Sequence, residues 1–236
     1  MRALILAAGR GLRLHPHTLD IPKCLLKVGG KELLEYQLDA LYSYNIKGVA
    51  LVTGHHADKV KGKAGNRAKC IFNPLYDKGG ILFSFQAAKD YVYGKEFIYM
   101  AGDIIFHPKI LELILNQKGD IVLGVEKKEC DEEDSKALIS EGEIIKMGKK
   151  IKPVSNKELM TEFVHIAKFS EKGSQLFFDS ISDVFKEHGK YAFMMDALNA
   201  VIKRGIKLIP VYVSDLPRIE IDFIGDLEKA RNMIFH

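Results

Sequence analysis

The sequence predicts an α/β fold with a doubly wound, mostly parallel sheet that carries helices on both faces. Three observations predict it. Strand-like and helix-like segments alternate over the first two-thirds of the chain. The first strand-like run is continuously apolar, as in a strand buried on both faces. A loop rich in glycine and arginine follows that run directly, which is typical of the ligand-binding edge of such a sheet.

The expected elements follow in order along the chain. The first part predicts strands at 2–7, 49–52, 68–72, 97–101 and 121–125, with helices at 33–45, 81–91 and 109–115. Then the rhythm changes, because residues 137–140 and 143–147 flank Glu141-Gly142 as in a β-hairpin. The last part predicts strands at 163–169, 208–213 and 218–222, with helices at 173–185, 191–204 and 226–234. With no linker-like segment, we expect a single domain over residues 1–236, whose hairpin forms a small lobe over the carboxyl edge of the sheet.

Charge and composition narrow the function classes. The chain carries 35 basic and 31 acidic residues, a net charge of +4, without a block of like charges. This pattern argues against a nucleic-acid partner and against a polybasic membrane anchor, whereas a mild positive balance suits anionic ligands. No apolar segment approaches the ~20 residues that span a bilayer. The N-terminal apolar run is also shorter than the ~7–15-residue core of a signal peptide.

The three cysteines are Cys24, Cys70 and Cys130, odd in number and far apart in the sequence. That spacing argues against a disulfide framework and a zinc site, and favours a reducing compartment. We therefore expect a cytoplasmic protein that does not insert into membranes. The sequence leaves open whether the chain forms a homodimer.

The most informative segment is Leu6–Leu14, which reads LAAGRGLRL and is followed by Pro22-Lys23. Small residues let backbone N–H groups approach phosphate oxygens, and Arg13 and Lys23 add positive charge there. The plainer alternative is a glycine-rich turn with incidental arginines. A P-loop and a dinucleotide-binding loop are both excluded, because neither the GxxxxGK pattern nor the third glycine is present. The residues expected to bind the nucleotide are Leu6, Ala7, Ala8, Gly9, Arg10 and Gly11.

The pattern LAAGxGxRL…PK resembles that of the sugar-phosphate nucleotidyltransferases. Further matches are Gly102-Asp103 and Ile219–Phe223, so the resemblance covers nearly the whole chain. It implies a Rossmann-like sheet of the nucleotide-diphospho-sugar transferase type. It also implies attack on the α-phosphorus of a nucleoside triphosphate, with pyrophosphate as the leaving group. The implied catalytic residues are Arg13, Lys23, Asp103 and Asp222.

Segments 131–136, 166–170 and 195–198 resemble the phosphocholine cytidylyltransferase branch of that family. This branch implies CTP as the nucleotide and CMP as the transferred group. Gly79, Gly80 and Ser84 occupy the place where the family contacts the base, so we expect them to bind the nucleotide. Their pattern differs from the family's, which leaves a sugar-1-phosphate uridylyltransferase or thymidylyltransferase as the alternative.

Two aspartates from distant parts of the chain stand at strand ends, Asp103 after residues 97–101 and Asp222 at the end of 218–222. Carboxylates at the same edge of a sheet are able to share one metal ion, and the resemblance implies that these two hold Mg²⁺. Each also has a structural alternative as a turn or helix-cap residue, although Asp226 competes with Asp222 for the cap of the last helix. The nucleophile is the acceptor's own phosphate, so no catalytic histidine is required.

The acceptor should lie between the sheet edge and the later segments, where we expect it to contact Glu162, His165, Asp196 and Glu220. Asp196 interrupts an apolar helix, so it either faces solvent or binds an amine or hydroxyl group. The chain has no tryptophan, the strongest aromatic partner of a quaternary ammonium. The aromatic residues that would replace it are Tyr76, Phe83, Tyr191 and Phe193.

We expect the acceptor to be a small phosphorylated alcohol or amine, with phosphocholine-like compounds first and a sugar or polyol phosphate second. A glycosyltransferase is disfavoured because Gly102-Asp103-Ile104-Ile105 lacks an Asp-x-Asp motif. A non-catalytic regulatory subunit is disfavoured because such a protein would have lost one of the four charged catalytic residues.

Overall fold

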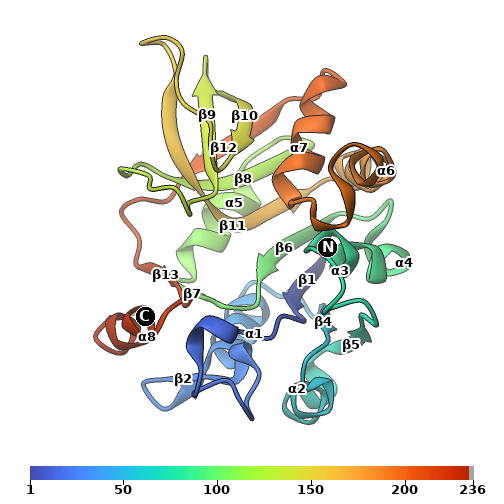
Figure 1. The fold of residues 1–236 in the computed structure, drawn as a ribbon, viewed down its shortest axis with the longest axis vertical. Helices are drawn as coiled ribbons and strands as arrows, with labels where there is room; N and C mark the ends of the chain where they lie inside the picture. Colours follow the sequence, from blue (N-terminus) through green and yellow to red (C-terminus); the bar gives the residue numbers. More distant parts are fainter. Residues whose placement is uncertain (234–236) are drawn as a thin grey trace.

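The computed structural model describes residues 1–233 and builds them around a nine-stranded sheet (Figure 1). From one edge to the other, its strands are β5 (Lys69–Phe72), β4 (Gly48–Thr53), β1 (Arg2–Ala7), β6 (Phe97–Ala101), β11 (Leu159–Phe169), β8 (Ile121–Glu126), β12 (Leu208–Tyr212), β10 (Glu143–Gly148) and β9 (Lys136–Ser140). The pairs β5–β4, β4–β1, β1–β6 and β8–β12 are parallel, whereas β11 runs antiparallel to β6 and β8. The predicted α/β architecture is confirmed, but the sheet is mixed rather than mostly parallel, because β9, β10 and β11 run antiparallel to the strands that they pair with.

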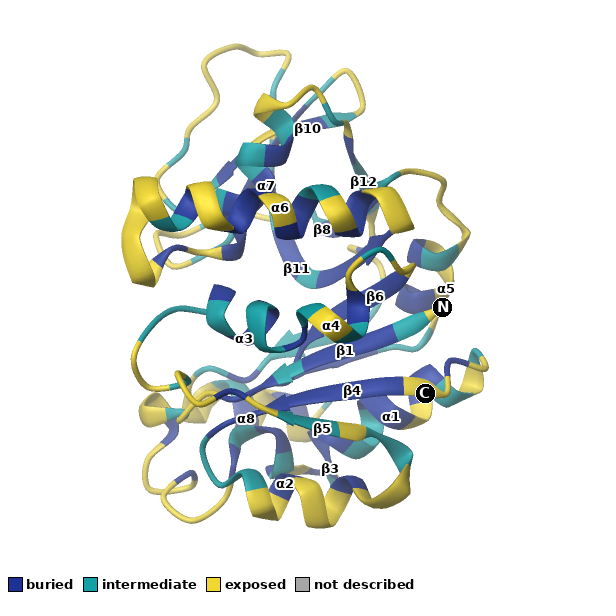
Figure 2. Cartoon of the chain, turned by 90° about the vertical axis from the view of Figure 1, so that its right-hand side faces the viewer, coloured by how far each residue is buried: buried dark blue, intermediate teal, exposed yellow. Residues whose placement is uncertain are grey.

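Helices cover both faces of the sheet. One face carries α1 (Leu33–Ser43), α2 (Ala57–Ala64) and α5 (Lys109–Asn116); the other carries α3 (Leu82–Ala87), α4 (Lys89–Val92), α6 (Glu171–His188) and α7 (Met194–Lys203). Because side chains of a strand alternate between its two faces, Ala3 and Ile5 of β1 pack on the face that carries α1, whereas Leu4 packs on the face that carries α6. Figure 2 shows the buried strands beneath helices whose outer sides are exposed. Burial on both sides therefore explains the apolar run that follows Arg2 in β1.

The predicted hairpin is present, and its turn residues Glu141 and Gly142 have φ values of 51° and 80°. It does not form a separate lobe, however. Ile144 of β10 pairs with Leu208 of β12, and the first part of β11 pairs with β9. The hairpin therefore extends the main sheet, because the eleven-residue β11 is long enough to pair with β9 at one end and with β6 at the other.

A second, two-stranded ladder lies beside the main sheet. β13 (Arg218–Glu220) pairs with β7 (Ile104–Phe106), which begins directly after Asp103. The strand predicted at 218–222 is present but ends at Glu220, so that Asp222 lies beyond it, and it pairs outside the main sheet. Figure 1 places this ladder next to α8 (Ile224–Arg231), near the C-terminus. Ile234, where we expected the last helix to end, lies outside the described residues.

Other differences from the expected elements are local. The helix expected at 81–91 is divided into α3 and α4 at Ala88. The sequence did not predict α2, because only two of its eight residues, Val60 and Ala64, are buried. The short strands β2 (Lys27–Val28) and β3 (Lys31–Glu32) were likewise not predicted. Among the described helices, none is both long and apolar enough to cross a membrane.

Candidate active site

A cavity of about 1030 Å³ opens at the carboxyl ends of β1 and β6. Its wall joins segments from both ends of the chain: the loop after β1, the turn after β6, the β8–β9 connection, β11, and the segment through β13 to α8. The carboxyl edge of an open α/β sheet is where ligands usually bind. The cavity therefore lies where the sequence predicted the site.

The loop after β1 contributes only part of its predicted residues to this cavity. Gly9, Arg10 and Gly11 line it. Gly11 has φ +62°, and an added Cβ would approach Thr18 Cγ2 at 3.2 Å, so glycine is required at this turn. The other three predicted residues, Leu6, Ala7 and Ala8, lie outside the lining. Leu6 O, in β1, accepts a hydrogen bond from Gly102 N, and Ala8 O, just beyond the end of β1, accepts one from His55 N.

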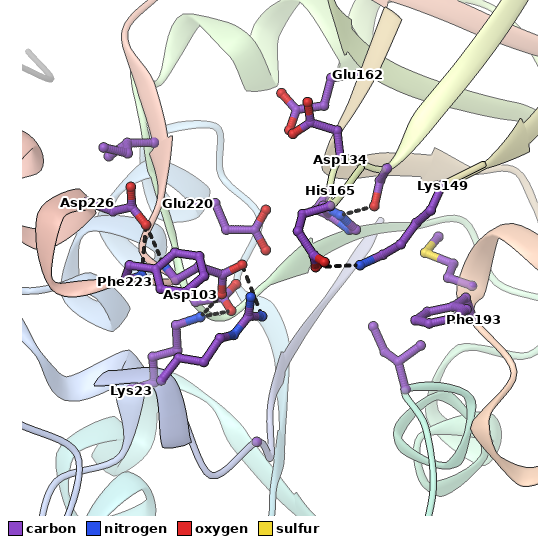
Figure 3. A pocket seen from close by; sticks show the side chains of 18 of the residues that line it. Lys23, Asp103, Asp134, Lys149, Glu162, His165, Phe193, Glu220, Phe223 and Asp226 are labelled. Carbon is purple, nitrogen blue, oxygen red and sulfur yellow. Dashed lines mark hydrogen bonds and ion pairs between the residues drawn. The ribbon is translucent and has the colours of Figure 1, made fainter. Parts of the chain in front are cut away.

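The four predicted catalytic residues converge beside this loop, and Figure 3 labels two of them, Lys23 and Asp103. Lys23 Nζ lies 2.6 Å from Asp103 Oδ2 and 2.7 Å from Asp222 Oδ1. Arg13 Nη2 lies 3.3 Å from Asp222 Oδ2. Burial lowers the pKa of Lys23, but the two carboxylates outweigh it and raise that pKa above its usual value. Burial raises the pKa of Asp222, but Lys23 and Arg13 outweigh burial, so that this pKa lies below its usual value. Lys23 and Asp222 therefore hold each other in the ionised form.

Neighbouring residues place the two aspartates. Asp103 lies in the turn between β6 and β7, and buried Gln37 of α1 clamps that turn by donating to Ala101 O at 2.7 Å and Ile104 O at 2.8 Å. Asp226 Oδ2 accepts hydrogen bonds from the backbone N–H groups of Asp222 and Phe223 at the start of α8. Because Asp226 takes the capping role, the carboxylate of Asp222 is left for the cavity.

Glu220 joins the two aspartates, although we had expected it to contact the acceptor. Carboxylate oxygens of Asp103, Glu220 and Asp222 lie within 4.8 Å of one another. Burial raises the pKa of Glu220, and Asp103 and Asp222 raise it further, whereas His165 and Lys23 lower it. Asp103 Oδ1 is buried without a hydrogen-bond partner among the described residues. Three oxygen donors with one orphaned acceptor suit a hard divalent cation.

The residues expected at the base are only partly exposed to the cavity. Gly80 lines it and donates to Lys190 O at 2.7 Å. Gly79 packs against Phe83, which an added Cβ would approach at 2.2 Å, and it lies outside the lining. Ser84 is buried and accepts a hydrogen bond from Asn73 at 3.0 Å. Gly79 and Ser84 thus lie outside the cavity lining, where they contact Phe83 and Asn73.

At the far end of the cavity, Glu162 belongs to a network of charges. Arg218 forms ion pairs with Glu162 and Glu126, and Lys128 lies 3.4 Å from Glu162 and 3.0 Å from Asp134. These charged residues belong to β8, the loop that follows it, β11 and β13. Their convergence gives the cavity a polar wall, and Figure 3 labels Glu162 and Asp134 of this wall.

His165 reaches the cavity through an irregularity in β11. The register shifts between Phe163 and Ala167, and His165 has φ +54°, a left-handed value that is uncommon for a residue other than glycine. Its Nε2 lies 2.9 Å from Ser135 Oγ. A β-bulge of this kind redirects a side chain and is frequent beside active sites. His165 therefore lines the cavity, and its contact with the acceptor stays a prediction.

Asp196 does not line the cavity. Its carboxylate accepts a 2.7 Å hydrogen bond from Phe193 N at the start of α7, which makes it a helix-capping group. Of the four aromatic candidates, Tyr191 and Phe193 line the cavity, whereas Phe83 stacks on Phe185 at 4.9 Å and Tyr76 lies outside the lining.

Sequence reasoning missed several lining residues: Glu126, Lys128, Asp134, Lys149, Arg218 and Phe223. Most stand in loops or on short strands, where no periodicity or motif marks a charged side chain as functional. A signal was available for two of them, since Asp134 lies in the segment 131–136 and Phe223 in the segment 219–223, both of which resemble the family.

The chain is similar to known nucleotidyltransferases. The family model described as MobA-like NTP transferase domain matches residues 3–132. The chain is similar to CTP:phosphoglutamine cytidylyltransferase of Campylobacter jejuni, with 28% identity over 97% of this chain and 98% of that protein. It is also similar to choline-phosphate cytidylyltransferase of Streptococcus pneumoniae, with 37% identity over 38% of this chain and 40% of that protein.

Other matches differ in length or show the fold alone. The bifunctional protein GlmU of Methanocaldococcus jannaschii is 26% identical over 97% of this chain, which spans only 58% of that protein. The inositol-1-phosphate CTP transferase of T. maritima has a TM-score of 0.79 at 22% identity, covering 99% of this chain and 97% of that chain. At this identity the structural likeness concerns the mixed α/β fold.

Proposed function

Because this chain belongs to the family of MobA-like NTP transferase domains, we propose that it transfers CMP from CTP to a small phosphorylated acceptor and releases pyrophosphate. The convergence of Arg13, Lys23, Asp103 and Asp222 beside the glycine loop carries the proposal. The similarity to CTP:phosphoglutamine cytidylyltransferase over nearly the full length of both proteins supports CTP as the nucleotide. Family membership also confirms the resemblance that the loop pattern indicates.

In the proposed mechanism, an oxygen of the acceptor's phosphate attacks the α-phosphorus of CTP. A new P–O bond forms there, the bond between the α-phosphorus and the bridging oxygen breaks, and pyrophosphate leaves with that electron pair. Backbone N–H groups of Gly9 and Gly11 would hold the phosphates, and Arg13 and Lys23 would neutralise charge that develops on the leaving pyrophosphate. An anionic phosphate needs no deprotonation, so the residues only bind and orient.

We propose Mg²⁺ as the cofactor, held by Asp103 and Asp222 with Glu220 beside them. The close approach of the three carboxylates and the orphaned Asp103 Oδ1 support this assignment. When bound, the ion would neutralise phosphate charge next to the α-phosphorus. The residues of the chain supply its oxygen ligands, and Gln37 and Asp226 hold those ligands in place.

For the acceptor, we propose a phosphorylated amine or alcohol bound at the far end of the cavity. Carboxylates predominate there, since Glu126, Glu162 and Asp134 face Lys128 and Arg218. An excess of carboxylates favours an ammonium or hydroxyl-rich head group over a second anion. His165 and Phe193 also line the cavity.

The three cysteines are free, as is usual in a reducing compartment, which supports our proposal that the enzyme works in the cytoplasm.

The test is pyrophosphate release measured with each of the four NTPs and a panel of acceptors. The panel holds phosphocholine, phosphoethanolamine, 2-aminoethylphosphonate, phosphoglutamine, inositol 1-phosphate and glucose 1-phosphate. We expect CTP with a phosphorylated amine or polyol to give the highest kcat/KM. If UTP or dTTP with glucose 1-phosphate were preferred, the chain would be a sugar-1-phosphate nucleotidyltransferase and the cytidylyl assignment would fall.

A further inference from the structure

The ammonium group of Lys23 occupies the space between the two carboxylates that we assign to the metal. Its Nζ contacts Asp103 Oδ2 at 2.6 Å and Asp222 Oδ1 at 2.7 Å, while Arg13 approaches the other oxygen of Asp222 at 3.3 Å. A cation that bridged the same two oxygens would lie where Nζ now lies. Lys23 and a metal ion are therefore alternative partners of this carboxylate pair.

The charge balance points the same way. Two cationic side chains, Lys23 and Arg13, already pair with the two carboxylates of Asp103 and Asp222, so that only the third carboxylate of the group, Glu220, has no ion pair among the described residues. A divalent ion entering this site alone would add two positive charges within a few ångströms of the Lys23 ammonium. At an effective dielectric constant of about 20, each unit of like charge at ~4 Å opposes binding strongly. The nucleotide-free site is thus poorly suited to hold a metal.

A triphosphate changes this balance. It brings several negative charges to the glycine loop, where Lys23 and Arg13 both line the cavity. Lys23 has a flexible four-carbon stem, and the Arg13 side chain is 51% exposed, so both can turn toward phosphate by side-chain rotation alone. Their departure would leave Asp103 and Asp222 without their cations, and the carboxylates would then favour a metal.

We propose that Lys23 serves as a built-in counter-ion that closes the carboxylate site in the nucleotide-free protein, so that the divalent cation binds only together with the triphosphate. The inference rests on the proposed function, because it assigns the triphosphate to the glycine loop. It makes the metal–triphosphate complex the substrate of this site. Because binding linkage is reciprocal, the metal must strengthen nucleotide binding by the same factor as the nucleotide strengthens metal binding.

The first experiment titrates chelator-treated protein with Mn²⁺ in the absence of nucleotide and follows free Mn²⁺ by electron paramagnetic resonance. Wild type should bind weakly, and Lys23→Met should bind at least about tenfold more tightly, because the competing charge is gone. Lys27→Met is the matched control, since Lys27 is an exposed lysine four residues away, and it should behave as wild type. Equal or weaker Mn²⁺ binding by Lys23→Met would overturn the proposal.

Two further measurements keep the test decisive. Adding Asp222→Asn to Lys23→Met should return Mn²⁺ binding to the wild-type level, and a gain that survived this change would lie elsewhere and refute the assignment. If circular dichroism showed that Lys23→Met does not fold, Lys23→Gln replaces it, because the amide keeps a hydrogen bond without the charge.

The last measurement is calorimetric titration of wild type with α,β-methylene-CTP. Mn²⁺ should strengthen this binding at least about tenfold, and no change would overturn the proposal. The outcomes are distinguishable from those of the activity test. If Lys23→Met binds Mn²⁺ more tightly but wild type releases no pyrophosphate from any NTP, the closed carboxylate site stands and the proposed function falls. If wild type releases pyrophosphate but Lys23→Met shows no gain in Mn²⁺ binding, the proposed function stands and the closed site falls.

Discussion

Replacement of Lys23 by methionine should separate the catalytic role of the charge from the packing role of the stem. The side chain is 14% exposed and makes two charge-assisted contacts, at 2.6 and 2.7 Å. Methionine keeps most of the apolar volume and removes the ammonium. We therefore expect a large change in turnover and a modest change in stability.

The magnitude of the turnover effect follows from where the charge acts. Removing one preorganised donor that stabilises developing negative charge typically costs about 10²–10³ in kcat, or roughly 3–4 kcal/mol. A Coulomb interaction of ~4 kcal/mol at 4 Å and an effective dielectric constant of 20 has the same size. We expect kcat of Lys23→Met to fall about 10²–10³-fold, with a smaller change in KM for the acceptor, which binds at the other end of the cavity.

The stability effect is smaller because water reaches the carboxylates. Asp103 and Asp222 are 24% and 30% exposed, so leaving them without Lys23 should cost about 1–2 kcal/mol rather than the ~3–5 kcal/mol of a fully buried pair. In a domain of this size the melting temperature would fall by roughly 2–8 °C. Pyrophosphate release at saturating CTP and acceptor gives kcat, thermal denaturation gives Tm, and Lys27→Met controls for loss of a lysine. A kcat within threefold of wild type, with an unchanged circular dichroism spectrum, would refute the assignment of Lys23.

Four further predictions concern other parts of the site and core. Asp103→Asn and Asp222→Asn should each abolish pyrophosphate release, and excess EDTA should do the same to wild type; full activity in EDTA would exclude a metal role. Gln37→Leu should lower kcat about tenfold while changing the KM for CTP little, because it frees the turn that holds Asp103; normal kcat would make the clamp purely structural. Asp196→Ala should lower Tm by a few degrees through loss of a cap and leave the acceptor KM unchanged; an altered KM would return this residue to the acceptor site. Burial raises the pKa of Cys24 to about 12, so iodoacetamide at pH 8 should leave it unmodified in the native protein and label it in urea, as mass spectrometry would show; equal labelling in both states would contradict the burial.

Local patterns in the sequence determined the core elements of this protein. The apolar run of β1, the helical spacing of Leu34, Leu38 and Leu41 in α1, and the turn Glu141-Gly142 each depend on residues within a few positions of one another. Helices and strands can be predicted from such patterns because the residues of a buried face recur in the sequence with the period of the element. The glycine loop and Lys23 were predicted from a motif, because the residues that make up the motif lie close together in the sequence at specific spacings.

The tertiary structure alone decided which charged residues meet. Glu220 joins Asp103 only because β13 pairs with β7, and Arg218 reaches Glu126 and Glu162 only because β11 lies antiparallel between β6 and β8. Strand order depends on packing across the whole chain and has no signature near any one of these residues. Asp196 shows the converse, since a carboxylate in an apolar helix suggested a ligand until the fold placed it on the N–H of Phe193. Distances between residues far apart in sequence are set by the packing of complete layers, so they enter only with the folded chain.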